Sequence, residues 1–202
     1  MMNISAMNEW IEAFEKNGFY EWPNFLDQSS AQAIRLEIEN LEAQERFKQA
    51  GIGKDANAHI NNSQRSDFIH WIDHRHPNQA ASVFIEKLQE LITQLNRNFY
   101  LGIRDFECHY THYPPGSFYK RHVDRHKSGS SRIVSFVFYL NQEWIDTDGG
   151  QLCIYAESQT VATINPQMGT LALFLSEKEH EVLVTQRDRM SITGWMLNEK
   201  IL

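Results

Sequence analysis

The chain has 202 residues, a length that suits one compact domain. Its 26 acidic and 19 basic residues give a formal net charge of −7, whereas proteins that bind phosphate backbones are usually basic. The composition, 42% hydrophobic and 12% aromatic, is that of a folded protein. No apolar run approaches the roughly 18 residues of a membrane helix, and the N-terminal residues show no secretory pattern. Two cysteines, Cys108 and Cys153, are too few for a disulfide scaffold and are expected to be small buried residues in a reducing cytosol. We therefore expect a cytoplasmic protein that binds neither membranes nor nucleic acids. A monomer is favoured, although the sequence leaves the oligomeric state open.

The first half of the chain has mainly the helical period of apolar residues. Helices are expected over residues 9–17, 28–49 and 80–95. Asp27 or Ser29 is expected to cap the second helix at its start, and Gly51 and Gly53 to end it. The polar, glycine-bearing stretch 51–66 is predicted to be a mobile loop.

After residue 104 the apolar period changes from about 3.6 to about 2. Eight short strands are expected, over residues 106–113, 118–123, 133–140, 151–155, 160–164, 170–175, 181–185 and 190–197. Helices followed by closely spaced strands predict an α+β protein with a jelly-roll core and the N-terminal helices packed on one outer face. We accordingly divide one compact domain into a helical support region, 1–104, and a β core, 105–202.

Three residues of the β region have the chemistry of a metal site. His122 and Asp124 stand two apart at the end of a predicted strand, so both side chains project from one face. His180, at the start of a later strand, is the best candidate for a third ligand. Two histidines and a carboxylate form the facial triad of non-haem Fe(II) oxygenases. His109 and His112 differ by three positions and point to opposite faces, so they are not a local ligand pair.

An arginine in a later strand suggests an anion site. Arg189 follows His180 by nine residues, and burying a guanidinium in a β-rich segment is costly unless it meets an anion. A guanidinium can hold a carboxylate through two parallel hydrogen bonds, and the Tyr139 hydroxyl can donate to the same group. Arg187, two residues away and expected on the same face, competes for this role, although the nine-residue offset favours Arg189. The alternative interpretation is a core tyrosine and a salt bridge at the rim.

The second half resembles the Fe(II)- and 2-oxoglutarate-dependent dioxygenases, and more closely the prolyl 4-hydroxylase branch. Within that branch it is most similar to the hypoxia-inducible-factor type of prolyl hydroxylase and its bacterial counterparts. The resemblance is carried by YPPGSFYKRHVD (113–124), FYLN (138–141), GGQL (149–152) and HEVLVTQRDRMSITGW (180–195). The order of these pieces is more specific than any one of them. A further match, RSDFIHWI (65–72), extends the resemblance upstream and implies a strand before the long helix.

The resemblance implies a double-stranded β-helix, with residues 105–202 as its catalytic core. It implies His122, Asp124 and His180 as iron ligands, and Arg189 as the partner of the distal carboxylate of 2-oxoglutarate, with Tyr139 on the same group. Positions that line the cosubstrate pocket in the family are matched by Tyr113, Leu152, Val182, Thr193 and Trp195. The stretch 113–122 is one residue shorter than in the animal enzymes, so the match at Tyr113 is less secure than the triad.

The implied activity is hydroxylation of a prolyl residue in a cytosolic protein, with O2 as second cosubstrate, succinate and CO2 as products, and ascorbate as a candidate reductant. For the bacterial relatives the candidate partner is elongation factor Tu. Three alternatives remain open: a small-molecule oxygenase, a non-catalytic jelly-roll that binds or senses 2-oxoglutarate or iron, and a zinc hydrolase, which leaves Arg189 and Tyr139 without a role. A nucleic-acid demethylase is disfavoured because that branch has a second arginine where this chain has Trp195.

Overall fold

The computed structural model describes residues 4–51, 59–125 and 130–201. Its elements are α1 (Ile4–Asn17), β1 (Phe19–Trp22), α2 (Gln28–Ala43), β2 (Lys48–Gln49), β3 (Phe68–Trp71), α3 (Gln79–Phe99), β4 (Asp105–Tyr113), β5 (Tyr119–His122), β6 (Arg132–Tyr139), the 3-10 turn η2 (Asp146–Asp148), β7 (Leu152–Ala156), β8 (Gln159–Ile164), β9 (Leu171–Leu175), β10 (His180–Val182) and β11 (Arg189–Leu197). None of the described helices combines the length and apolar character that crossing a bilayer requires.

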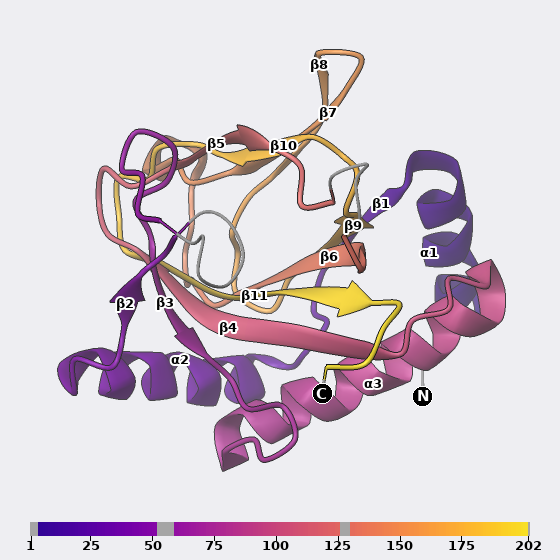
Figure 1. Ribbon diagram of the computed structural model, residues 1–202, viewed down its shortest axis with the longest axis horizontal. Coiled ribbons are helices and arrows are strands. Elements are labelled where there is room, and N and C mark those ends of the chain that lie inside the picture. The colour runs from indigo at the N-terminus through magenta and orange to yellow at the C-terminus, as the bar shows by residue number, and fades with distance from the viewer. Residues whose placement is uncertain (1–3, 52–58, 126–129, 202) are drawn as a thin grey trace.

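Two antiparallel sheets form the core of the fold. The larger has the strand order β1-β9-β6-β11-β4-β3-β2, and the smaller has the order β5-β10-β7-β8. The helices lie along the outer side of the larger sheet, and the β7–β8 hairpin projects from the opposite side of the molecule (Figure 1). This is the α+β jelly-roll that the sequence predicts, with the helices on one outer face.

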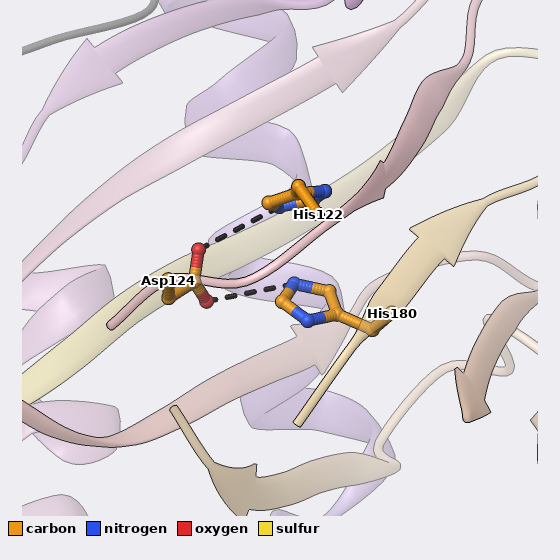
Figure 2. Close-up of side chains that lie close together, drawn as sticks. All are labelled: His122, Asp124 and His180. Atoms are coloured by element: carbon orange, nitrogen blue, oxygen red, sulfur yellow. Dashed lines mark ion pairs between the residues drawn. The ribbon is translucent and has the colours of Figure 1, made fainter. Parts of the chain in front are cut away.

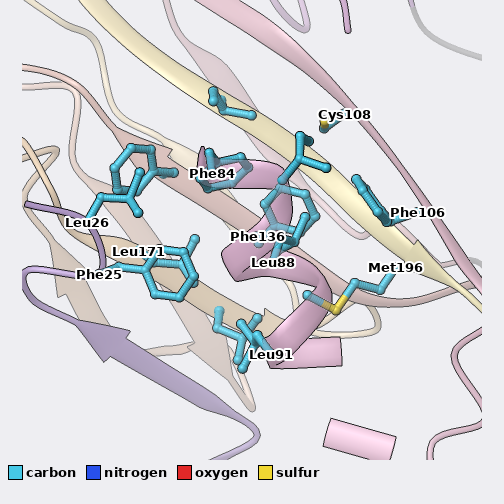
Figure 3. Packing of buried hydrophobic residues seen from close by; sticks show 14 of the residues in the cluster. Phe25, Leu26, Phe84, Leu88, Leu91, Phe106, Cys108, Phe136, Leu171 and Met196 are labelled. Carbon is cyan, nitrogen blue, oxygen red and sulfur yellow. The ribbon is translucent and has the colours of Figure 1, made fainter. Parts of the chain in front are cut away.

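The alternation of side chains along each strand divides the apolar interior in two. On β6, Val134, Phe136 and Phe138 face the core between the larger sheet and the helices, whereas Val137 and Tyr139 face the core between the two sheets. Figure 3 shows the first of these cores, where side chains of α3 meet those of β4, β6, β9 and β11. The helices therefore pack against one face of the larger sheet, and the opposite face of that sheet lines the space between the two sheets.

The second helix is shorter than predicted, and the helix expected up to residue 49 ends at Ala43. Glu45 adopts a left-handed backbone conformation with φ of 55°, and the Arg46 amide donates to the Leu41 carbonyl at 3.0 Å. Glycine normally occupies this kind of helix end. Because a glutamate occupies it here, the sequence carries no stop signal, and the expected stop at Gly51 and Gly53 was wrong.

The N-terminal half also supplies three strands to the larger sheet, and of these only the segment 65–72 was expected to be extended. The other two are β1 and β2, which are four and two residues long and too short to show an alternating pattern. All eight strands predicted after residue 104 are present, with ends that differ by at most three residues. Asp27 caps α2 as predicted, accepting a hydrogen bond from the Ser30 amide at 2.9 Å.

The cysteines and the loop 51–66 were also the subject of expectations. Cys108 and Cys153 are both buried, as expected for small core residues. The predicted mobile loop, 51–66, falls in part on residues 52–58, which lie outside the described residues. The division at residues 104 and 105 stays a prediction.

Candidate active site

Two histidines and one aspartate come together between the two sheets (Figure 2). His122 ends β5 and His180 begins β10, and these neighbouring antiparallel strands place the two residues directly opposite each other. Asp124 lies two residues beyond β5, with carboxylate oxygens 3.6 Å from His122 Nε2 and 3.5 Å from His180 Nε2. One ligand atom from each side chain lies within 4.8 Å of the others, a spacing that suits a single metal ion.

Each histidine is oriented by its second ring nitrogen. His122 Nδ1 lies 2.7 Å from the Lys120 carbonyl oxygen, and His180 Nδ1 lies 2.9 Å from the Lys178 carbonyl oxygen. A carbonyl oxygen only accepts hydrogen bonds, so in both rings Nδ1 carries the proton and Nε2 keeps its lone pair. Backbone carbonyls fix metal-binding histidines in this tautomer. Both lone pairs are therefore available beside the Asp124 carboxylate.

The Asp124 carboxylate is also held from behind. Ser135 Oγ on β6 donates to Asp124 Oδ2 at 2.7 Å and lies 2.9 Å from Ser176 Oγ. Burial disfavours the charged carboxylate, but His180, His122 and the Ser135 hydroxyl outweigh burial and lower the pKa of Asp124 below its usual range. Burial lowers the pKa of His180 to about 4. At neutral pH the site thus offers an ionised carboxylate and a neutral imidazole, as metal binding requires.

Arg189 is a buried cation in the same cavity. Its side chain is 1% exposed, and its Nε donates to the Gly150 carbonyl oxygen at 2.8 Å. The guanidinium lies 4.9 Å from the ring centre of Tyr113 and 5.1 Å from that of Tyr139. Within the described residues, no carboxylate forms an ion pair with it. An uncompensated buried charge is costly, so the site is built to receive an anion.

Several buried donors in this region lack partners. In the part of the chain that the structure describes, Arg189 Nη2, Tyr139 Oη and Trp195 Nε1 are buried without a hydrogen-bond partner. Buried polar groups are nearly always hydrogen-bonded, and Arg189 Nη2 and Tyr139 Oη belong to neighbouring side chains, so these two donors indicate a missing acceptor beside them. A carboxylate fits this pattern, because it accepts several hydrogen bonds and neutralises the guanidinium.

Arg187, the competing candidate, lies outside the cavity. Its side chain is 47% exposed, and it forms an ion pair with Asp148 at 2.8 Å. Because β11 begins only at Arg189, Arg187 belongs to the preceding bend and does not share the strand's inward face. The structure therefore distinguishes two arginines that the sequence left in competition.

The other predicted pocket residues lie mainly in the cavity wall. Tyr113, Leu152, Val182, Thr193 and Trp195 line it, together with Val137 and Phe174. Tyr139 is not among the residues that line the cavity and lies next to Arg189. The histidines of β4 are separated as predicted, because His109 lines the cavity, whereas His112 Nδ1 lies 2.8 Å from Glu42 Oε1 and His112 Nε2 lies 2.8 Å from Asp188 Oδ1.

Sequence reasoning assigned no role to some of the residues in the cavity wall. Arg65 and Asp67 form a two-pronged ion pair there, with distances of 2.7 and 2.5 Å, and the Arg65 guanidinium lies 4.3 Å from the ring centre of Tyr119. Tyr119 in turn stacks on His122 with ring centres 3.6 Å apart. The match at RSDFIHWI was the available signal, since it flagged this segment without giving its side chains a role.

Comparisons with known proteins agree with this geometry. Residues 108–197 match the sequence family described as the 2OG-Fe(II) oxygenase superfamily. A hypoxia-inducible factor prolyl hydroxylase from Caenorhabditis elegans is 30% identical over 67% of this chain, and the match spans only 20% of the nematode protein. The crystal structure of a Pseudomonas putida prolyl-4-hydroxylase superimposes with a TM-score of 0.84 at 33% identity, covering 95% of this chain and 98% of that one. A Trichoplax adhaerens prolyl hydroxylase, solved with a hypoxia inducible factor peptide fragment, gives 0.83 at 26% identity, covering 98% and 94%.

The chain belongs to the 2OG-Fe(II) oxygenase superfamily, and its homologues include prolyl hydroxylases. Membership implies Fe(II), 2-oxoglutarate and O2. The residues present fit these groups, because the His-Asp-His cluster provides a metal site and the unpartnered donors around Arg189 provide a carboxylate site.

Proposed function

We propose that this protein hydroxylates a prolyl residue within a polypeptide, using Fe(II), 2-oxoglutarate and O2. The observation that carries the proposal is the pairing of a His-Asp-His cluster with a buried arginine that has no carboxylate partner among the described residues, both in one cavity. A zinc hydrolase or a simple metal site does not need a buried arginine without a carboxylate partner. A dicarboxylate that binds metal through one end needs both the His-Asp-His cluster and the arginine.

Each residue of the cluster has a defined role in this proposal. His122, Asp124 and His180 hold Fe(II), and Arg189 binds the distal carboxylate of 2-oxoglutarate, with Tyr139 Oη as a second donor. When bound, Fe(II) and 2-oxoglutarate activate O2 for hydroxylation of a C–H bond, releasing succinate and CO2. The apolar side chains of Val137, Leu152, Phe174 and Val182 limit water in the cavity.

The surface next to the cavity suits an apolar ring such as proline. Trp71 on β3 is 52% exposed, and its ring centre lies 5.0 Å from that of His109 and 6.5 Å from that of Trp195. Since His109 and Trp195 line the cavity, aromatic surface continues from the interior toward solvent. The Trichoplax relative was solved with a peptide of a hypoxia inducible factor, which supports a polypeptide substrate here.

The substrate protein is proposed to be cytosolic. Elongation factor Tu is the candidate that the sequence resemblance suggests, and ascorbate is the proposed reductant that keeps iron as Fe(II). The enzyme is proposed to act as a monomer.

Mass spectrometry of candidate substrates tests the proposal. The purified protein is incubated with Fe(II), 2-oxoglutarate, ascorbate and either elongation factor Tu or a set of proline-containing peptides, with free proline as the small-molecule control. We expect one added oxygen atom on a prolyl residue of a polypeptide, formed with equimolar succinate and absent with Asp124→Ala. Hydroxylation of free proline alone would contradict the polypeptide assignment.

A further inference from the structure

A row of polar side chains crosses the wall of the cavity that β4 and β11 form. Strands β4 and β11 pair antiparallel, which sets Thr193 opposite His109 and Ser191 opposite Thr111. Thr111 Oγ1 lies 3.0 Å from His109 Nδ1 and 3.1 Å from Thr193 Oγ1, and Thr193 Oγ1 lies 3.5 Å from Ser191 Oγ. His109, Thr111 and Thr193 all line the cavity, and the first two are at most 2% exposed.

The hydrogen bonds of this row run in one direction, from His109 through Thr111 to Thr193. Thr111 has one hydroxyl proton and donates it to Thr193 Oγ1. Its contact with His109 must then be a hydrogen bond from Nδ1–H to Thr111 Oγ1. The Tyr110 carbonyl oxygen, 3.3 Å from the same Nδ1, also only accepts and requires the same tautomer. Burial, and after it the charge of Arg65, lowers the pKa of His109 to about 4, so the ring is neutral.

The end of the row is Thr193, whose Oγ1 accepts the hydrogen bond from Thr111 and whose own hydroxyl hydrogen is left to donate. Its described neighbour, Ser191 Oγ, lies at the 3.5 Å limit of a hydrogen bond. A hydroxyl that accepts one hydrogen bond becomes a better donor, because the bonds of a chain polarise one another. The best remaining acceptor position is therefore inside the cavity, on whatever ligand fills it.

We infer that His109 and Thr111 are positioning residues that fix the Thr193 hydroxyl as a hydrogen-bond donor to an acceptor oxygen of the bound 2-oxo acid. The inference rests on the proposed function, since it takes 2-oxoglutarate as the ligand. It adds a neutral, oriented donor to the charged anchor at Arg189. Neither His109 nor Thr111 needs to touch the ligand, because each acts through Thr193.

Equilibrium binding without turnover tests the inference. The protein is loaded with Mn(II) in place of Fe(II), and the Kd for 2-oxoglutarate is measured by calorimetry for wild type, Thr193→Val, Thr111→Val and the double variant. We expect each single variant to raise the Kd about fivefold, the value of one net hydrogen bond. The double variant is expected to bind no more weakly than Thr193→Val alone, because Thr111 acts only through that hydroxyl.

Conservative variants separate positioning from packing. Thr111→Ser keeps the hydroxyl and should bind 2-oxoglutarate as the wild type does. His109→Asn offers an amide N–H near the position of Nδ1 and should bind more tightly than His109→Leu, which has no donor. Thermal melting of every variant confirms that the Kd values are compared between folded proteins.

The outcomes distinguish this inference from the proposed function. If the wild type binds 2-oxoglutarate and folded Thr111→Val binds it equally well, the inference is overturned and the proposed function stands. The inference would also be overturned if the Kd of the double variant rose by the product of the two single-variant factors, because Thr111 would then act independently of Thr193. If the metal-loaded wild type does not bind 2-oxoglutarate, the proposed function fails and the inference fails with it.

Discussion

Two arginines two positions apart differ completely in environment, and this difference defines the chemistry of the cavity. Arg187 is half-exposed and neutralised by Asp148, whereas Arg189 is buried with no carboxylate partner among the described residues. Stability alone does not favour an unpaired buried guanidinium, since desolvation of the charge is not offset. We therefore interpret Arg189 as a residue kept for ligand binding.

At the same scale, the hydroxyl behind the carboxylate should control metal affinity. Ser135 Oγ donates to Asp124 Oδ2, and removal of such a partner typically weakens metal binding by roughly 10- to 100-fold. We expect Ser135→Ala to weaken Mn(II) binding by that factor, measured by calorimetry. Ser82→Ala, a half-buried serine of α3 whose hydroxyl donates to the Gln79 carbonyl oxygen, is the matched control. Equal Mn(II) affinity of Ser135→Ala and wild type would contradict this role of the hydrogen bond.

The buried imidazole of His109 should make stability depend on pH. Its pKa is about 4 in the folded protein against an ordinary value of 6.5, so between these values the unfolded chain binds more protons. The free energy of unfolding should therefore fall as pH drops through this window, by up to about 1.4 kcal/mol per pH unit from this residue. Urea unfolding of the metal-free protein at steps across the window measures the slope.

His109→Asn removes the titrating group and should flatten that slope. His180 also titrates with a lowered pKa, but it is present in both proteins and cancels in the difference. Identical slopes for wild type and His109→Asn would show that His109 is not buried as a neutral ring.

At the scale of elements, the turn before β7 places the backbone partner of Arg189. Gly149 and Gly150 both have positive φ, and the Gly150 carbonyl accepts the hydrogen bond from Arg189 Nε. A Cβ at Gly149 would lie 2.1 Å from the Val184 carbonyl oxygen, so this position needs glycine for space as well as for conformation. The tight turn thus sets where the guanidinium can sit.

Two glycine variants separate conformation from space. Gly116 also has positive φ, but a Cβ there would meet nothing within 4 Å. We expect Gly116→Ala to lower the free energy of unfolding by about 1 kcal/mol, from backbone strain alone. Gly149→Ala should cost roughly 1–3 kcal/mol more, because the chain must also move. Chemical denaturation measures both, and equal losses would contradict the close approach at Gly149.

The elements also show what sequence patterns can and cannot predict. The eight C-terminal strands have a clear alternating period, and all eight were predicted. The helix end at Glu45 was missed because a glutamate adopts the conformation that glycine usually signals. The strands β1 and β2 were missed because their pairing with β9 and β3 comes from distant residues and not from local pattern.

At the scale of the whole molecule, the site joins residues from both halves of the chain. H-x-D, a strand arginine and the order of the motifs that carry the family resemblance suggested that the triad and Arg189 share one site, and the structure brings these side chains to one cavity. Their roles as iron and cosubstrate ligands stay a prediction. The place of Ser135 could not be predicted, because period 2 shows that it shares a face with Val137 but not that this face borders the His-Asp-His cluster. Arg65 and Asp67 reach the cavity only because β3 pairs with β4, which is a property of the complete sheet.

The anaerobic visible spectrum of the protein with Fe(II) and 2-oxoglutarate shows whether the cavity holds the metal and the oxo acid together. Chelation of iron by the oxo acid gives a charge-transfer band, so the band reports metal and cosubstrate bound together. We expect the band in the wild type and in Arg187→Lys, its loss in Asp124→Ala, and a much higher 2-oxoglutarate requirement in Arg189→Lys. Absence of the band in wild-type protein with Fe(II) demonstrably bound would contradict the assignment of this cavity as a 2-oxoglutarate site.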